Sequence, residues 1–278
     1  MKIVFIADAF AEQVLGGGEL NNEELLKMLA QDGHDVLKIN SHKVTPEFID
    51  RHIESKFIIA NFANLKPVLR NKICDTTYVI YEHDHKYLNT RNPGEYPGFK
   101  APKEEIVNIE LYKKARAVLC QSQFHLEIIK MNTELDNLIN LSGNLWSLRS
   151  LDLMKAMAEK PKSECCSIMQ SNIIHKNTRE AIMYCKHKKM PYKLVSSKNY
   201  ESFLDQLSEN KTLLFLPKTP ETLSRVVVEA RMMGMSVIVN KMIGATREPW
   251  YELKGKDLIE YMRVKRKMIK DVVLERLS

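Results

Sequence analysis

Ten short apolar segments recur along the chain, and a turn or a stretch with helical periodicity separates each one from the next. Apolar strands that alternate with helices are typical of parallel sheets covered on both faces. The pattern therefore predicts an α/β protein with doubly wound parallel sheets. The ten expected strands are residues 2–7, 36–39, 57–60, 77–81, 117–121, 138–141, 165–169, 192–195, 213–216 and 236–240.

The length of the chain indicates two domains. Its 278 residues exceed one average domain and suit two domains of about 130 residues, each with its own core. Ser142, Gly143 and Asn144 form the best candidate linker. We therefore predict an N-terminal Rossmann-like domain over residues 1–145 and a C-terminal one, with a terminal helix, over residues 146–278.

Composition places the protein among ordinary globular proteins, with 44% hydrophobic and 28% charged residues. No apolar run approaches the roughly 20 residues of a membrane span, and the N-terminus enters a strand without a signal-like segment. These features predict a soluble, cytoplasmic protein. The five cysteines show no C-x-x-C spacing, which favours reduced thiols over a zinc site.

The two halves differ in charge. Residues 1–145 carry 17 Lys and Arg against 20 Asp and Glu, a net charge of −3. Residues 146–278 carry 25 against 15, a net charge of +10. The second half is therefore the expected anion-binding half, which fits a nucleotide diphosphate and leaves duplex DNA open as a further partner. A solvated basic surface without a partner is the common alternative.

The segment that follows the strand at 213–216 contains the main candidate site. Helical periodicity over residues 222–233 predicts a helix that ends at Gly234 and leads into another strand. Glu221 then lies at the carboxyl end of a parallel strand, where ligands of such sheets bind. Glu229, eight residues later, is displaced by about 80° and two helical turns, so both carboxylates can contact one long ligand.

The order Glu221, seven residues, Glu229-Ala230, Gly234 and a Val-Ile-Val strand resembles the E-x7-E element of the retaining family 4 glycosyltransferases. This resemblance implies a compact GT-B fold, in which two Rossmann-like domains face a cleft. It implies that Glu221 is catalytic and lies against the donor sugar, while Glu229 binds the nucleotide ribose. Leu223, Ser224 and Arg225 are further expected donor contacts.

Three glycines, Gly16 to Gly18, follow the first strand and precede an expected helix over residues 19–31. Glycines permit close approach of a ligand to the backbone, although a flexible turn is the common alternative. The G-x-G-x-x-G dinucleotide pattern is absent. The resemblance implies a Gly-rich loop here, with Gly17 and Gly18 on the donor and Glu19 on the acceptor side.

The strand at 77–81 leads into Glu82, His83, Asp84 and His85. Histidine titrates near neutral pH and can donate a proton to a hydroxyl or a leaving group. A surface turn explains such a cluster about as often. The resemblance implies a histidine at this strand end, for which His83 is the best match and His85 the second. Asp84 and His85 are expected on the acceptor side.

The segment after the strand at 165–169 is where the resemblance implies an Arg and a Lys that bind the donor diphosphate. Lys176 fits the lysine position, but Ser171 stands where arginine is expected. A hydroxyl does not replace a bidentate guanidinium. Arg225 is the candidate that compensates for this difference.

The resemblance implies sugar transfer from a nucleotide-sugar to an acceptor hydroxyl with retention. No Asp-x-Asp metal motif appears, so no metal or other cofactor is expected. The short, Lys-, Met- and Asn-rich chain also resembles phage-encoded glycosyltransferases, some of which modify hydroxymethylated pyrimidines. A hydroxymethylated base in DNA is therefore the first expected acceptor, and a glycan is the second. A non-catalytic protein that binds nucleotide-sugars or nucleic acid is the alternative class.

Overall fold

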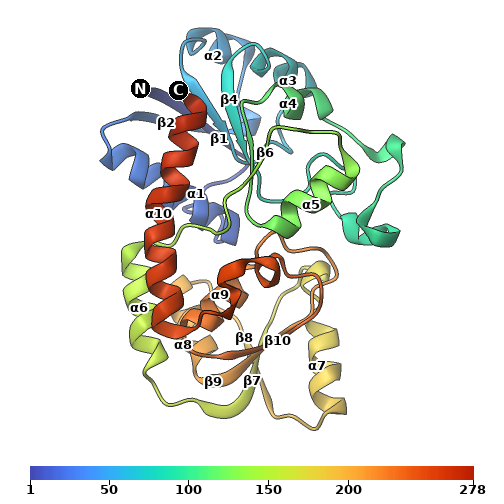
Figure 1. Ribbon diagram of the computed structural model, residues 1–278, viewed down its shortest axis with the longest axis vertical. Coiled ribbons are helices and arrows are strands. Elements are labelled where there is room, and N and C mark those ends of the chain that lie inside the picture. The colour runs from blue at the N-terminus through green and yellow to red at the C-terminus, as the bar shows by residue number, and fades with distance from the viewer. The chain divides into compact units, whose positions relative to one another are not determined.

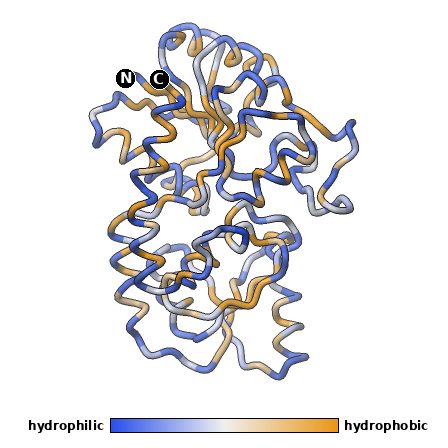
Figure 2. Tube along the Cα trace, viewed as in Figure 1, coloured by the Kyte–Doolittle hydropathy of each residue, from blue (hydrophilic) through white to orange (hydrophobic).

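The computed structural model describes all residues from 1 to 278 and divides into two compact units. The first comprises Met1–Leu145 and Arg266–Ser278, and the second comprises Trp146–Lys265. Each unit contains one sheet of parallel strands with helices between the strands (Figure 1). The hydropathy-coloured trace shows the strands of both sheets as hydrophobic segments (Figure 2). The predicted α/β class and all ten expected strands are confirmed.

The sheet of the first unit has the order β2-β1-β3-β4-β5-β6. Alternate residues of its strands enter two separate apolar clusters, with Val4 and Phe57 in one and Phe5 and Val79 in the other. Both faces of the central strands are therefore buried, which explains why those strands are largely apolar, whereas the edge strand Asp35–Asn40 is only partly buried. The strands are β1 (Lys2–Ala7), β2 (Asp35–Asn40), β3 (Lys56–Ile59), β4 (Thr77–Tyr81), β5 (Val118–Cys120) and β6 (Leu138–Asn140). The helices are α1 (Gly17–Gln31), α2 (Pro46–Arg51), α3 (Pro67–Ile73), α4 (Ile109–Lys114) and α5 (Gln123–Asn132).

The sheet of the second unit has the order β10-β9-β7-β8, so the direction of strand addition reverses between β7 and β9. Such a reversal opens a crevice at the carboxyl ends of the two strands, because their following loops turn to opposite faces. The strands are β7 (Ser163–Met169), β8 (Tyr192–Val195), β9 (Asn210–Phe215) and β10 (Ser236–Val239). The helices are α6 (Leu148–Ala158), α7 (Thr178–His187), α8 (Tyr200–Ser208) and α9 (Arg225–Met232).

The terminal helix α10 (Gly255–Leu277) contributes to both units. Leu258 and Met262 belong to the core of the second unit, whereas Ile269 and Val273 belong to a core of the first. The sequence placed the whole of this helix in the second domain. Residues 266–278 instead pack in the first unit, because the apolar stripe of the helix continues to its end. No helix of the structure has both the length and the hydropathy needed to cross a membrane.

Two predicted helix starts are wrong. α9 begins at Arg225 and not at residue 222, because Ser224 adopts a left-handed conformation with φ of 76°. Glu221 is extended and forms a bridge with Ile243, so the expected helical displacement between Glu221 and Glu229 does not apply. α1 begins at Gly17, which places two of the three glycines inside its first turn and not in a loop.

Candidate functional site

His83 lies just beyond the end of β4 and is fixed through both ring nitrogens. Its Nε2 is 2.6 Å from Oδ1 of Asn22 on α1, and its Nδ1 contacts Nε2 of Gln121. The amide nitrogen of Gln121 donates to Nδ1, so Nε2 carries the proton that it donates to Asn22. Both ring nitrogens of His83 are therefore engaged within the first unit.

The start of α1 lies against the same histidine. A Cβ atom added to Gly18 would be 3.6 Å from Cγ of His83, which is an ordinary van der Waals contact, so the helix backbone at Gly18 lies close to the ring. Gly16 precedes the helix in an extended conformation, with φ of −131°. Burial raises the pKa of Glu19 in the first turn, and the nearby Asp84 adds to this shift. The structure thus places Gly18 beside the predicted histidine.

The other two predicted residues after β4 are engaged within the protein. Asp84 accepts hydrogen bonds from Lys86, at 2.7 Å, and from Nε of Arg91, at 3.0 Å. Burial alone disfavours its charge, but these two cations hold the pKa of Asp84 below its usual range. His85 is only 1% exposed and lies between the rings of Tyr87 and His125. The structure therefore does not support the acceptor-side role expected for His85, because the chain turns its side chain into the core.

The sequence did not assign a role to Glu82, which organises this strand end. Its fully buried carboxylate accepts hydrogen bonds from the backbone N–H groups of His83, at 3.1 Å, and Asp84, at 3.0 Å. Nζ of Lys86 and the hydroxyl of Tyr112 also donate to it. Burial raises the pKa of Glu82, which the ammonium of Lys86 opposes. Tyr112 lies 30 residues further along the chain, so no local pattern indicates this contact.

In the second unit, Lys176 and Glu221 form an ion pair at the carboxyl edge of the sheet. Nζ of Lys176 is 2.8 Å from Oε1 of Glu221, and both side chains are partly exposed. Lys176 follows β7 and Glu221 follows β9, and these two strands are neighbours. The sheet thus joins two predicted site residues that are 45 positions apart, at the point where the strand order reverses.

The start of α9 lies directly after Glu221. Ser224 precedes the helix, and its hydroxyl is buried without a hydrogen-bond partner. The first N–H groups of a helix also lack partners within the helix and favour an anion. The side chain of Leu223 is fully buried, so only its backbone can contact a ligand. These groups can bind a phosphate beside the Lys176 and Glu221 pair.

Glu229 and Arg225 point into the second unit. Oε1 of Glu229 accepts hydrogen bonds from Nε1 of Trp146, at 2.9 Å, and from the hydroxyl of Tyr200, at 2.6 Å. Nε of Arg225 is 3.2 Å from the same oxygen, and its guanidinium lies 4.5 Å from the ring of Trp146. Arg225 is therefore a partner of Glu229 and is not positioned to compensate for Ser171. Trp146 and Tyr200 were not predicted, because they lie 83 and 29 positions from Glu229.

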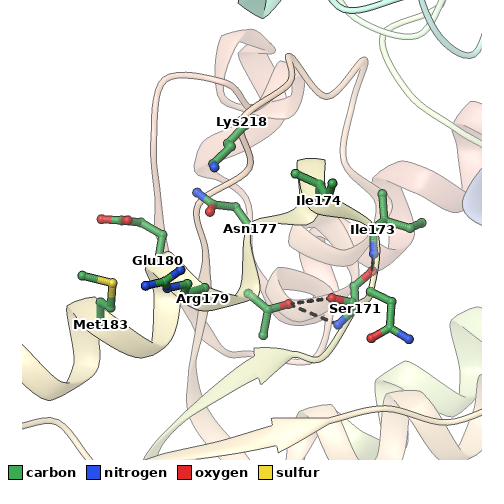
Figure 3. A pocket seen from close by; sticks show the side chains of 10 residues that line it. Ser171, Ile173, Ile174, Asn177, Arg179, Glu180, Met183 and Lys218 are labelled. Atoms are coloured by element: carbon green, nitrogen blue, oxygen red, sulfur yellow. Dashed lines mark hydrogen bonds between the residues drawn. The ribbon is translucent and has the colours of Figure 1, made fainter.

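A pocket of about 440 Å³ lies next to this site in the second unit (Figure 3). Its wall consists of the segment after β7, the first turns of α7, and Lys218 after β9. Ser171 and Arg179 are among the lining residues, whereas Lys176 and Glu221 are not. The pocket is therefore a separate hollow on the same loops.

The cysteines and acidic residues form no metal centre. All five cysteines are free, and no group of three or more His, Cys, Asp or Glu side chains is arranged to hold a metal ion. Burial raises the pKa of Cys166 to about 12, and Cys185 adds to this shift. A buried thiol of this kind is unreactive at neutral pH.

Comparison with known proteins gives matches among solved structures alone. No protein-family model and no curated protein sequence matches the chain. The structure of HepE (Alr3699) from Anabaena in complex with UDP and glucose is 14% identical and matches with a TM-score of 0.58. That match covers 100% of this chain and 91% of HepE. The same protein with UDP-glucose matches at 12% identity and a TM-score of 0.54, over 100% and 96% of the two chains.

A second enzyme among the matches is an alpha-glucosyltransferase in complex with UDP and a 13-mer DNA that contains an HMU base. It is 12% identical, with a TM-score of 0.50, and the match covers 100% of this chain and 95% of that enzyme. The similarity extends over the whole chain in each case. The protein therefore shares the two-sheet α/β fold of these structures.

Proposed function

We propose that the protein is a glycosyltransferase that moves a sugar from a nucleotide-sugar to an acceptor hydroxyl. The observation that carries the proposal is the Lys176 and Glu221 ion pair at the strand-order reversal of the second sheet. The pair belongs to a chain whose fold matches HepE solved with UDP-glucose and an alpha-glucosyltransferase solved with UDP and DNA. Carboxyl edges of parallel strands at such reversals are the usual ligand sites of these sheets.

The donor site in this proposal lies on the loops after β7 and β9. Lys176 supplies positive charge for the donor diphosphate, and Ser224 with the first N–H groups of α9 supplies hydrogen-bond donors. Glu221 contacts the sugar and stabilises the positive charge that develops at its anomeric carbon. The ion pair holds both side chains in place before the donor binds.

In the transfer step, the oxygen of the acceptor hydroxyl forms a bond with the anomeric carbon of the donor sugar. The bond between that carbon and the diphosphate oxygen breaks, and the diphosphate leaves with the electron pair. The hydroxyl proton passes to the departing phosphate oxygen. Reaction of both bonds on one face of the sugar gives retention of configuration, which is part of the proposal.

The acceptor in this proposal is a hydroxymethylated base in DNA. Support comes from the net charge of +10 over residues 146–278, which favours a polyanion, and from the HMU-containing DNA in one structural neighbour. A primary hydroxyl on a base is also a chemically suitable nucleophile. An acceptor glycan offers the same group without the negative charge, so salt dependence distinguishes the two acceptors.

The main test is turnover of the Glu221→Gln variant. UDP-, GDP- and ADP-sugars are first screened for donor hydrolysis, and the active donor is then offered with hydroxymethylated DNA, unmodified DNA or a glycan panel. Glu221→Gln should lower turnover at least about a hundredfold, the scale of losing one electrostatic contact to the transition state. Glu209→Gln, on an exposed acid paired with Lys193, is the matched control.

Three outcomes decide the assignment. Loss of turnover in a folded Glu221→Gln variant, with Glu209→Gln unchanged, supports the proposed role. Full turnover by Glu221→Gln contradicts it. Binding of a nucleotide-sugar without any turnover by the unaltered protein would show a non-catalytic binding protein.

A further inference from the structure

Glu229 lies at the centre of a buried polar cluster in the second unit. It occupies the second turn of α9, and only 2% of its surface is exposed. Its partners come from elements that are distant in the sequence. Trp146 precedes α6, and Tyr200 begins α8, which packs against α9 (Figure 1). The cluster therefore depends on the packing of several elements of the second unit.

Two hydrogen-bond donors and one cation converge on a single oxygen of this carboxylate. Oε1 of Glu229 accepts hydrogen bonds from Nε1 of Trp146, at 2.9 Å, and from the hydroxyl of Tyr200, at 2.6 Å. Nε of Arg225 lies 3.2 Å from the same oxygen. Nη2 of Arg225 also donates to the hydroxyl of Tyr200, at 3.4 Å. These contacts fix the orientation of the carboxylate, so the direction of its second oxygen is fixed as well.

The second oxygen of Glu229, Oε2, accepts no hydrogen bond within the protein. Buried polar atoms are rarely left in this state, because the loss of water on burial is then not compensated. Burial and the neighbouring carboxylate raise the pKa of Tyr200, so its hydroxyl keeps its proton and donates to Oε1. The cluster thus supplies donors to one oxygen and leaves the other to accept a hydrogen bond from a ligand.

The helix that carries Glu229 begins at the proposed donor site. Ser224, which precedes α9, has a buried hydroxyl without a partner. Glu229 lies five residues later, about 7 Å along the helix axis at a rise of about 1.5 Å per residue. A ligand with a phosphate at the start of α9 therefore reaches Oε2 only with a hydroxyl group remote from that phosphate. A nucleoside diphosphate has such groups, because the 2′- and 3′-hydroxyls of its ribose lie away from the 5′-diphosphate.

We propose that Tyr200 and Trp146 are positioning residues that make the protein selective for ribonucleotide donors. The inference rests on the transferase function proposed above and extends it to the choice of donor. Tyr200 and Trp146 hold Oε1 of Glu229, so that Oε2 accepts a hydrogen bond from a ribose hydroxyl. Neither residue contacts the donor itself, because both act through the orientation of the carboxylate.

Nucleotides that differ by one hydroxyl group test this proposal. UDP, GDP and ADP are titrated into the protein by calorimetry, and the tightest of them is compared with its 2′-deoxy and 3′-deoxy forms. Wild type should bind the ribonucleotide at least about tenfold more tightly than one deoxy form, the scale of one hydrogen bond to a charged group. Tyr200→Phe should weaken the ribonucleotide about threefold to tenfold and leave that deoxy form unchanged. Trp146→Phe removes the other donor and provides the same comparison if Tyr200→Phe does not fold.

Tyr192→Phe is the matched control, because the hydroxyl of this half-buried tyrosine on β8 makes no hydrogen bond within the protein. A preference for the ribonucleotide that falls in Tyr200→Phe and not in Tyr192→Phe supports the proposal. Equal weakening of ribonucleotide and deoxynucleotide in Tyr200→Phe overturns it, because a purely structural role affects both. Equal affinity of wild type for the two nucleotides also overturns it, and sugar transfer by that protein leaves the transferase function standing. A wild-type protein that binds no nucleotide and transfers no sugar overturns both proposals.

Discussion

Replacement of Ser224 by glycine should stabilise the second unit and weaken donor binding at the same time. Ser224 has φ of 76° and ψ of 84°, a left-handed conformation that disfavours residues with a Cβ atom. Its hydroxyl is also buried without a partner. Ser224 therefore has two features that lower the stability of the folded protein, and it lies at a proposed phosphate site. Its replacement should raise stability at the cost of ligand binding.

The expected gain in stability follows from three contributions. Relief of the left-handed conformation contributes about 1 kcal/mol, and removal of the unpaired hydroxyl contributes about 1 kcal/mol. The greater freedom of glycine in the unfolded chain costs about 0.5–1 kcal/mol. The free energy of unfolding should therefore rise by about 1 kcal/mol, which corresponds to an increase in Tm of about 2–4 °C.

The assay compares Ser224→Gly with Ser224→Ala by thermal and urea unfolding, and both with wild type in donor binding. Alanine removes the hydroxyl but keeps the strained backbone, so Ser224→Ala should gain less stability than Ser224→Gly. Both variants lose the proposed contact with the phosphate and should bind the nucleotide diphosphate more weakly. A Ser224→Gly protein with the Tm of wild type or lower would refute the strain argument. Unaltered diphosphate binding in both variants would refute the role of the hydroxyl.

Two further predictions concern carboxylates that form ion pairs. Glu229→Ala should lower the free energy of unfolding by about 3–5 kcal/mol, because it leaves the buried Arg225 without its ionic partner, whereas the exposed Glu209→Gln should change the urea midpoint little. A Glu229→Ala protein as stable as wild type would contradict the buried pair. The pKa of Asp84 is lowered in the folded protein, so its ion pairs contribute stability that is present above its unfolded pKa of about 3.9 and is lost as the pH falls below that value. The difference in urea midpoint between wild type and Asp84→Asn should accordingly be larger at pH 6 than at pH 3, and an equal difference at both pH values would contradict this linkage.

The sequence alone determined the strands of the protein. The strand at residues 77–81 has the predicted bounds, because a strand buried on both faces must be apolar along most of its length. The strand at residues 192–195 also has the predicted bounds, although it lies at the edge of its sheet and is exposed at Lys193 and Leu194. The sequence also indicated the carboxyl ends of these strands as candidate sites. Lys176 and Glu221 could be selected in this way, since both follow strands of one parallel sheet.

Contacts between distant residues were decided by the tertiary structure alone. Periodicity cannot show that Ser224 has a left-handed backbone. Leu223 and Val226 keep helical spacing whether the helix begins at residue 222 or at Arg225. Glu229 was expected on a ligand, yet Trp146 and Tyr200 reach it from other elements of the second unit.

The same reason explains the pocket and the two ends of α10. Arg179 and Lys218 come together because β7 and β9 are adjacent, and the order of strands in a sheet is not visible in a local pattern. The apolar stripe of α10 predicted a buried face but not which core each part would join. Local composition sets which segments are buried, whereas the partners of each segment depend on packing of the whole chain.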